Sequence, residues 1–438
     1  MPFRPLFALL FVSACAHAQS LQERIDAHPG EAILLAGARI EVNAALRIIA
    51  SGTHIAGPGT IVQTNPDVSI IEIAGANEVV VENVTLMRAP GHEETTQHGI
   101  HARDGNGIEI RAVRVIDNRS PAGTIYLENC RNSVVKDCLV RNYKRVTVDD
   151  RTASDLYGYA FRVIDGTGIL VNRGTDILIS DNRVIDENLL PTPGMKEKHG
   201  LGQLCEGAHP TNKGKLAPKG DYANNWHQGS AITVTDPLNT THVTVRGNFI
   251  VNAAQGIDLH ADNILCTGNQ IDHAFIGIKC MHGAQDVIIS DNNISHVDLW
   301  GIVMMPGTAS HTGKPAHEGN PAQPANLTRG NIIANNVFSH FGHGHEYWNW
   351  KDNTTAVISL ESGQLAENPV MRDVIVSGNM IHDPGQDGVL QADGSIAPEP
   401  PRYKYAIYMT PEPRPQDIFF SGNVFHPGSV GVSNIPLE

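Results

Sequence analysis

The chain is poor in aromatic residues and has no excess of positive charge. Phe, Trp and Tyr make up 5% of its 438 residues, whereas hydrophobic residues as a whole make up 41%. The formal net charge of −14 argues against nucleic-acid binding, because contact with phosphates requires a basic surface. It also argues against a polyanionic substrate, unless basic side chains are concentrated at the binding site.

Cysteine is also scarce. Beyond the N-terminal segment the sequence contains Cys130, Cys138, Cys205, Cys266 and Cys280. An odd number of cysteines without Cys-x-x-Cys spacing indicates neither a disulfide framework nor a zinc site built from cysteines. We expect Cys138 and Cys280 to occupy inward-facing core positions, and a bridge between Cys266 and Cys280 stays open as an alternative.

Long hydrophobic runs are absent after the N-terminus. Residues 1–18 predict a signal peptide for export: Arg4 is positively charged, residues 6–12 are apolar, and Ala16-His17-Ala18 is a small-x-small cleavage site. The apolar run is too short to span a membrane, and no other segment predicts a transmembrane helix. Residues 12–15 are similar to a bacterial lipobox. We therefore expect a periplasmic or secreted protein, with a lipoprotein anchored through Cys15 as the alternative.

A short phrase recurs along most of the chain: a small residue, then Asn, then an apolar β-former. The asparagines are Asn182, Asn248, Asn269, Asn292, Asn336, Asn379 and Asn423. Their successive intervals are 66, 21, 23, 44, 43 and 44 residues, all near multiples of about 22. A period in this range indicates a solenoid.

Each repeat contains short runs rich in β-branched residues, such as Ile177-Leu178-Ile179 and Val287-Ile288-Ile289, which are too short for helices. A second run precedes each of these and usually opens with Gly or Ala, as in Gly277-Ile278. Two or three short strands per turn, punctuated by Gly and Asn, are typical of one coil of a parallel β-helix. We expect Asn at the corner, because it tolerates left-handed backbone geometry and its amide can hydrogen-bond to the next coil.

The repeat resembles the right-handed parallel β-helix, or pectate-lyase-like, superfamily over residues 73–438. The resemblance implies an all-β, right-handed solenoid in a single elongated domain. A propeller would need about forty residues per blade, and the intervals of 21 and 23 residues leave no room for one. We expect residues 19–72 to form an N-terminal cap and first strands, with a short helix over residues 21–27. Such a cap covers the apolar core and the unpaired backbone of the first coil.

Three segments rich in Pro and Gly interrupt the repeat, at residues 188–228, 306–325 and 384–404. Loops of this length in a compact domain are usually functional. Because loops of a solenoid emerge at the same corner of successive coils, we expect these segments to wall a groove. Surface insertions without a role are the alternative.

Strand alternation predicts a polar cluster on the outer face of the coils. If Ile257 and Ile278 point inward, then Asp258, His260 and Lys279 point outward on consecutive coils about 4.8 Å apart. We expect these three residues to be catalytic. The candidate substrate-binding residues around them are Thr233, Thr235, Asp262, His282 and Trp300, together with the more distant Trp348.

A solvated ladder of salt bridges would explain Asp258 and Lys279 equally well. The presence of His260 between them favours a catalytic site over such a ladder, because the unperturbed pKa of histidine suits proton transfer near neutral pH. His98 and His101 also face outward, but four or five coils away, at roughly 20 Å from His260.

The segment Gly256-Ile257-Asp258-Leu259-His260 resembles the Tyr-Gly-x-Asp-Pro-His motif of the mannuronan C-5 epimerases, which share the β-helix fold. The resemblance implies that Asp258 and His260 are catalytic, with His260 as the base or acid at the C-5 proton of the sugar. Lys279 lies where a cation would neutralise the adjacent carboxylate of the sugar. Gln255 replaces the Tyr of the motif, so a phenolic partner would have to come from elsewhere. The candidates are Tyr126, Tyr157 and Tyr159.

Other residues suggest different chemistry. Asp149-Asp150 with Gly342-His343-Gly344 resembles the polygalacturonases, which use paired aspartates for inverting hydrolysis. A hydrolase could also pair Asp258 with Asp236 or Glu361.

The segment after Phe341 contains further candidates. His343, His345 and Glu346 could bind a metal, although alternate histidines in a Gly-rich loop are more often solvated. Tyr347, Trp348 and Trp350 could stack on sugar rings or form a small apolar cluster under the loop.

The sequence thus predicts an exported polysaccharide-active enzyme, a lyase or C-5 epimerase that abstracts a proton from a uronate residue. A glycoside hydrolase and a non-catalytic glycan-binding surface protein are the alternatives. We expect a polysaccharide as partner, no nucleic acid and no metal site or cofactor, while assistance by calcium stays open. Oligomer formation is possible but is not predicted.

Overall fold

The computed structural model describes most of the coils. The described residues are 19–120, 122–144, 166–187, 229–306, 325–341, 356–362, 368–383, 388–398 and 400–437, with the backbone of residues 151–154, 158–161, 209–210 and 216–217. The predicted export signal, Cys205, the Asp149-Asp150 pair and the segment that contains Trp348 lie outside this set, as do most of residues 188–228, residues 307–324 and residues 384–387.

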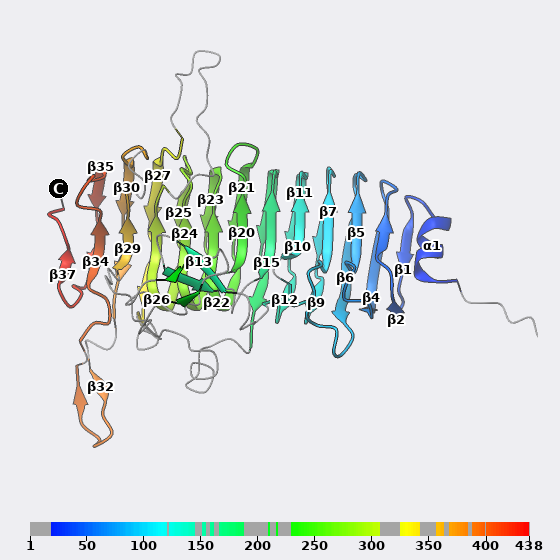
Figure 1. Cartoon of the computed structure of the whole chain (residues 1–438), viewed down its shortest axis with the longest axis horizontal. Helices are drawn as coiled ribbons and strands as arrows, with labels where there is room; N and C mark the ends of the chain where they lie inside the picture. The colour runs from blue at the N-terminus through cyan, green and yellow to red at the C-terminus, as the bar shows by residue number, and fades with distance from the viewer. Residues whose placement is uncertain are drawn as a thin grey trace, which may run out of the picture.

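The described coils form a parallel β-helix. Thirty-one of the described strands belong to one continuous sheet, and they pair with one another in parallel. Figure 1 shows these strands as a row of coils that runs from α1 (Leu21–Ala27) at one end to β37 (Gly431–Ser433) at the other. The all-β solenoid predicted from the repeat is therefore confirmed.

Each coil contributes to three faces, which we call sheets 1, 2 and 3. Sheet 1 contains β3 (Leu46–Ile48), β5 (Ile71–Ala74), β7 (Ile100–Arg103), β10 (Gly123–Glu128), β15 (Thr167–Asn172), β20 (Ser230–Thr235), the C-terminal parts of β22 (Phe249–Leu259), β24 (Gln270–Cys280) and β26 (Asn293–Met304), then β29 (Ala356–Leu360), β34 (Tyr405–Met409) and β37.

Sheet 2 contains β1 (Ala32–Leu34), the N-terminal parts of β4 (His54–Gln63) and β6 (Val80–Arg88), β8 (Glu109–Arg111), β11 (Arg131–Lys136), β16 (Thr175–Ser180), β21 (Thr241–Arg246), β23 (Asp262–Thr267), β25 (Ile288–Ser290), β27 (Arg329–Ala334), β30 (Arg372–Ser377) and β35 (Gln416–Ser421).

Sheet 3 contains β2 (Arg39–Val42), the C-terminal parts of β4 and β6, β9 (Arg114–Ile116), β12 (Leu139–Arg141), β17 (Arg183–Ile185), the N-terminal parts of β22, β24 and β26, then β28 (Val337–Ser339), β31 (Met380–Ile381) and β36 (Val424–Phe425).

Among the described residues, three short antiparallel pairs lie outside the coils. They are β13 (Arg151–Ser154) with β14 (Gly158–Phe161), β18 (His209–Pro210) with β19 (Leu216–Ala217), and β32 (Val389–Leu390) with β33 (Ile396–Ala397). The last pair forms the projection at the C-terminal end in Figure 1.

Inward-facing aliphatic side chains stack from coil to coil along the core. Ile257, Ile278 and Ile302 occupy equivalent register positions and are fully buried, as predicted. Gly256 precedes the first of them because a Cβ there would lie 2.5 Å from the carbonyl oxygen of Gly277 on the next coil. Narrow coils filled by such side chains explain why the chain needs few aromatic residues.

The repeated asparagines form a continuous hydrogen-bonded ladder at the corner between sheets 2 and 3. The Nδ2 atom of each donates to the Oδ1 atom of the next, at 2.9–3.0 Å, from Asn182 through to Asn423. The predicted stacking of amides is confirmed. The predicted left-handed backbone of the Asn is wrong, because the residue before it has the positive φ, as in Asp181 and Gly247. Asp or Gly thus makes the bend, except before Asn336, where Asn335 makes it, and the Asn that follows connects the coils.

The N-terminal end of the coils is covered by α1. Its Leu21 and Ile25 side chains are buried, and Ser20 and Glu23 form a reciprocal capping box. The strands that follow, β1 and β2, already pair in parallel with β4, so the first coil begins within the segment expected to form the cap.

The described cysteines behave as core residues. Cys130, Cys138, Cys266 and Cys280 are buried and free, so Cys138 and Cys280 occupy the predicted core positions and no bridge joins Cys266 to Cys280.

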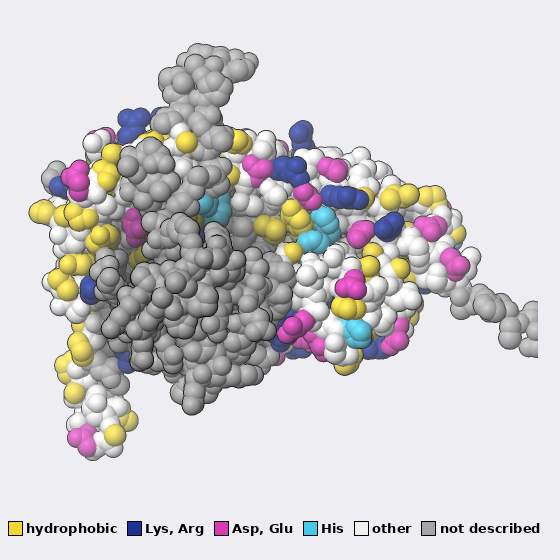
Figure 2. Space-filling model, viewed as in Figure 1, with side chains coloured by type: hydrophobic (Ala, Val, Ile, Leu, Met, Phe, Trp, Pro, Cys, Tyr) yellow, Lys and Arg dark blue, Asp and Glu magenta, His cyan; other side chains and the backbone are white. Residues whose placement is uncertain are grey.

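The C-terminal end of the coils differs from the N-terminal end. Hydrophobic side chains gather there on the surface (Figure 2), and Phe419, Val424, Val430 and Val432 are exposed. Within the described residues no helix has both the length and the apolar character needed to cross a bilayer.

Candidate functional site

Asp258 and Lys279 occupy the same outward position on two neighbouring strands of sheet 1. Thr233 on β20 pairs with Asp258 on β22, which pairs in turn with Lys279 on β24. His260 follows two residues after Asp258 and so points the same way. Its backbone N–H donates to the carbonyl oxygen of Val234, which places it beside Thr235. The register of the coils therefore gathers these polar side chains.

The carboxylate of Asp258 contacts both of its predicted partners. Its Oδ1 lies 2.6 Å from Nε2 of His260, and its Oδ2 lies 3.1 Å from Nζ of Lys279. Only 8% of the Asp258 side chain is exposed, against 14% for His260 and 15% for Lys279. The structure thus brings the three residues together as expected from strand alternation, and their catalytic role stays a prediction.

The electrostatics of the cluster favour an ionised Asp258. Burial by itself would raise the pKa of this carboxyl, but contacts with His260 and Lys279 outweigh burial and lower the pKa well below its usual range. A carboxylate with so low a pKa is a poor proton acceptor at neutral pH and a good fixed partner for an imidazole. Asp258 therefore suits orientation of His260 better than proton abstraction.

The other side of the His260 ring faces Thr235 and His282. Nδ1 of His260 lies 3.5 Å from Oγ1 of Thr235, and the His282 ring meets the His260 ring edge to face with centroids 4.4 Å apart. Because Nε2 of His260 contacts Asp258, Nδ1 is the ring nitrogen that can exchange a proton with a bound molecule.

The remaining predicted residues lie in different surroundings. Asp262 begins β23 on sheet 2, and its Oδ1 accepts a hydrogen bond from the backbone N–H of Gln285 at 3.0 Å, which is a structural contact. Trp300 is buried in an apolar cluster with Phe275, Val303 and other residues, which is separate from the main core. Among the described residues its indole N–H has no hydrogen-bond acceptor.

The tyrosine that the epimerase motif requires is not supplied by Tyr126. The register along sheet 1 runs from Tyr126 through Leu170 and Thr233 to Asp258, which is three coils or about 14 Å. Tyr126 stacks instead on His101, with ring centroids 4.8 Å apart. Tyr157 and the Tyr159 side chain lie outside the described residues.

The hydrolase candidates are also separated from the cluster. Glu361 follows β29, which lies three coils beyond the coil of Asp258. The register runs from Asp258 through Lys279 and Val303 to Ser359 of β29. A separation of about 14 Å exceeds the 6.5–9.5 Å range typical of two acting carboxylates in an inverting glycosidase. Asp236 lies in the turn after β20, where its Oδ1 accepts a hydrogen bond from the Asn239 amide.

Glu361 is nevertheless an unusual acid. Burial raises the pKa of its carboxyl to about 7, although Oγ of Ser359 donates a hydrogen bond to its Oε1 at 2.9 Å. A carboxyl that keeps its proton near neutral pH can act as a general acid.

The sequence matches the family model described as the right-handed beta helix region over residues 49–207. No curated protein sequence matches the chain.

Solved structures share the architecture at low identity. DFA-IIIase from Arthrobacter chlorophenolicus A6, in complex with DFA-III, is 11% identical with a TM-score of 0.55, covering 91% of this chain and 89% of that one. A Family 28 exopolygalacturonase from Yersinia enterocolitica is 10% identical with a TM-score of 0.54, covering 94% and 74%.

The A-module of a mannuronan C-5 epimerase from Azotobacter vinelandii is 11% identical with a TM-score of 0.47, covering 95% and 94%. Its score is too low to support an argument about shared chemistry. Together with the coil geometry, the family match and the two more similar structures identify the chain as a right-handed parallel β-helix protein.

Proposed function

We propose that this protein is an exported enzyme that acts on a uronate-containing polysaccharide by proton abstraction, as a lyase or C-5 epimerase. The observation that carries the proposal is the contact of one buried carboxylate with both an imidazole and an ammonium group. Burial of a charged group is unfavourable unless partners compensate for it, and clusters of this kind occur preferentially at functional sites.

Each residue has a distinct role in the proposed reaction. Nδ1 of His260 removes the proton from C-5 of the sugar, and Asp258 holds the ring and stabilises its protonated form. Lys279 stabilises the negative charge that develops on the sugar carboxylate. Return of a proton to the opposite face gives the epimer, whereas loss of the sugar attached through O-4 gives an unsaturated product.

One feature of the geometry limits the role of Lys279. Its ammonium group already contacts Asp258, so part of its charge is compensated before a substrate arrives. The proposed reaction therefore requires Lys279 to contact the carboxylates of Asp258 and substrate together, which its three N–H donors permit.

The names of similar structures support action on carbohydrate. One is an exopolygalacturonase, and another is DFA-IIIase with DFA-III bound. At 10–11% identity they establish the fold alone, so they do not distinguish a lyase from a hydrolase.

Product analysis tests the proposal. Purified protein is incubated with alginate, pectate, glucuronan and neutral glycans in ordinary and deuterated water. A lyase gives a C4–C5 double bond that absorbs ultraviolet light, and an epimerase incorporates deuterium at C-5 without shortening the chain. New reducing ends without ultraviolet absorption would show hydrolysis and reject proton abstraction. No change in any glycan would leave only the binding function.

A glycoside hydrolase on the same scaffold is the second candidate, and Glu361 favours it. Its carboxyl, with a pKa of about 7, suits protonation of a leaving sugar oxygen. Asp258 is too distant to be its partner, so this reaction would require another carboxylate near β29.

A further inference from the structure

The corner at the end of sheet 3 is occupied by histidine on three consecutive coils. His273, His296 and His340 follow the sheet 3 parts of β24 and β26, and β28, and all three have a left-handed backbone with φ between 51° and 58°. The equivalent residue on the coil before them is Asn252, with φ of 61°. Because Asn also suits this backbone, the turn itself does not require an imidazole.

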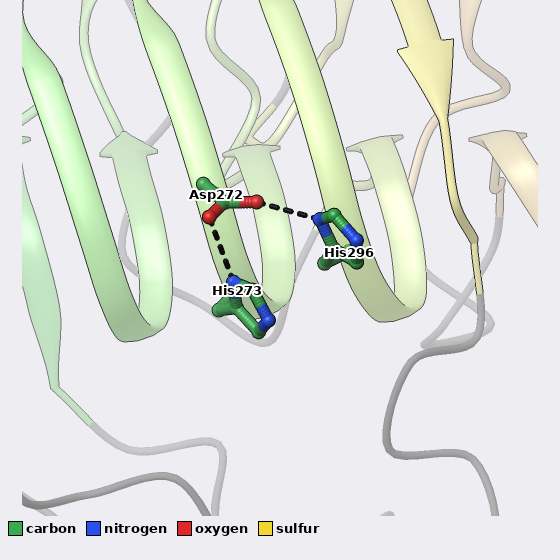
Figure 3. Close-up of side chains that lie close together, drawn as sticks. All are labelled: Asp272, His273 and His296. Carbon is green, nitrogen blue, oxygen red and sulfur yellow. Dashed lines mark hydrogen bonds and ion pairs between the residues drawn. The ribbon is translucent and has the colours of Figure 1, made fainter.

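Two of these histidines contact one carboxylate. Asp272 lies immediately before His273 on β24, and the coil register places it beside Ser295 of β26. Its Oδ2 lies 2.8 Å from Nδ1 of His273, and its Oδ1 lies 2.7 Å from Nδ1 of His296. Figure 3 shows both rings turned toward the carboxylate from neighbouring coils. The rings are parallel within 5°, with centroids 4.5 Å apart.

The group is polar and accessible. The exposed fractions of the side chains are 35% for Asp272, 22% for His273 and 31% for His296. Partial burial would raise the pKa of Asp272, but hydrogen bonds from His273, His296 and Ser295 outweigh it and lower the pKa well below the usual range. The carboxylate is therefore ionised at neutral pH.

We propose that Asp272, His273 and His296 bind a divalent transition-metal ion of the zinc or nickel type. One ligand atom from each residue can be chosen so that all three lie within 4.8 Å of one another. Metal–nitrogen and metal–oxygen bonds of about 2.0–2.2 Å can span such a group after small side-chain movements. The ion takes the place of the protons now shared between Asp272 and each Nδ1, and a neutral imidazole then keeps its proton on Nε2.

The ligand types select the metal. Two imidazole nitrogens and one carboxylate suit zinc, nickel, cobalt or copper ions, whereas calcium and magnesium prefer oxygen ligands alone. The partial exposure of the three side chains leaves room for water at the remaining coordination positions. This site lies on sheet 3, away from the outward face of sheet 1 that carries Asp258, so it is independent of the proposed reaction.

Binding would join two coils. Asp272 and His273 belong to one coil and His296 to the next, so an ion held by all three would fasten β24 to β26 at the corner. An ion that binds only the folded chain stabilises it, and this stabilisation grows with the logarithm of the free ion concentration once that concentration exceeds the dissociation constant.

Metal titration of the full-length, chelator-treated protein tests the site. Zinc and nickel binding is measured by calorimetry, and cobalt binding by visible absorption. The variants are His273→Asn and His296→Asn, which keep the residue type found at Asn252. His340→Asn is the matched control, because His340 occupies the same corner and stacks on His296 at 4.7 Å but does not belong to the cluster.

We expect one ion per chain in the wild type and the control, with binding at least about 100-fold weaker in the two cluster variants. Circular dichroism checks that each variant is folded. Equal affinity in wild type and His273→Asn would overturn the proposal, since the ion would then be bound by other histidines among the 21 of the chain. Absence of binding to the wild type would overturn it as well.

Discussion

At the scale of single residues, strand alternation and coil spacing were sufficient to place Asp258, His260 and Lys279 together. They could not reveal that Asp258 sits between the other two, because pairing depends on side-chain conformations that the pattern leaves open. Nor could they predict that Asp262 would hydrogen-bond to the backbone of Gln285. A polar residue beside a corner can hydrogen-bond to the backbone of the turn as readily as to a bound ligand.

His260→Ala should abolish turnover and leave the coils folded, although Asp258 loses one of its two partners. The imidazole lies on the outer face and is not part of the apolar core, while loss of a general base typically lowers the rate by 10²–10⁴-fold. The rate on the responsive polysaccharide and the thermal unfolding midpoint are measured together. His101→Ala, on the same face four coils away, is the control and should keep its activity. Retention of most activity by His260→Ala would reject the assignment.

Asp258→Asn should lower the free energy of unfolding at neutral pH by about 3 kcal/mol, because it leaves Lys279 and His260 without their common anion. The folded pKa of Asp258 lies below its unfolded value, so this stabilisation is present above the unfolded value and is lost as the pH falls through the folded pKa. Urea unfolding across the acidic range should show this loss in the wild type and a smaller one in the variant. Equal acid sensitivity would contradict the inferred ion pairs.

Glu361 should have the opposite pH dependence. Its folded pKa of about 7 lies above the ordinary value of 4.5, so its favourable contribution is complete below 4.5 and disappears as the pH rises through 7. Glu361→Gln should therefore make the unfolding free energy less dependent on pH between 4.5 and 7. If the wild type and Glu361→Gln gave parallel stability curves over that interval, the raised pKa would be incorrect.

At the scale of structural elements, the strands and corners were the most predictable part of the molecule. Short β-branched runs at a fixed period determine strands that can bury their inward face only by stacking. The helix over residues 21–27 was likewise visible from its amphipathic pattern. The backbone of the corner was predicted incorrectly because Asp, Gly or, before Asn336, another Asn precedes each ladder Asn. The sequence alone does not show which of the two residues bends the chain.

The cluster of Asp272, His273 and His296 was missed, although a signal was present. His273 and His296 are separated by 23 residues, the same interval as Asn269 and Asn292. Equal spacing means that each histidine occupies the same place in its coil. A search for polar residues in phase with the asparagines would have found the pair.

Asn292→Ala should destabilise the protein by roughly 3 kcal/mol, because several buried groups lose partners at once. The Asn292 side chain donates to Asn336 and to the Cys266 carbonyl, and it accepts from the Asn269 backbone N–H. Asn423→Ala, at the last described position of the ladder, should cost less. Chemical denaturation measures both, and an equal cost would show that the ladder is not cooperative.

At the scale of the whole molecule, the elongated shape follows from the repeat, whereas the long loops do not. Segments without periodicity carry no register, so the sequence predicts that they leave the coils but not where they lie. The predicted groove wall at residues 188–228 thus remains a prediction.

Ile25→Asp should expose the first coil and promote self-association. Ile25 is on the buried side of α1, and an uncovered coil end offers an apolar surface and unpaired strand edges to another molecule. Light scattering after size-exclusion chromatography should show larger species. Asp26→Asn, on the exposed side of the same helix, is the control. A monodisperse Ile25→Asp protein of unchanged size would show that the helix is dispensable.

The asparagine ladder also gives the cylinder a direction. Each side-chain amide donates a hydrogen bond toward the C-terminal end and accepts one from the N-terminal side, so all the hydrogen bonds of the ladder point the same way. An added coil can continue the ladder only if it contains its own asparagine at the corner and its amide donates in the same direction. Duplication of the 21 residues 248–268 should therefore lengthen the protein by one turn without disturbing its neighbours.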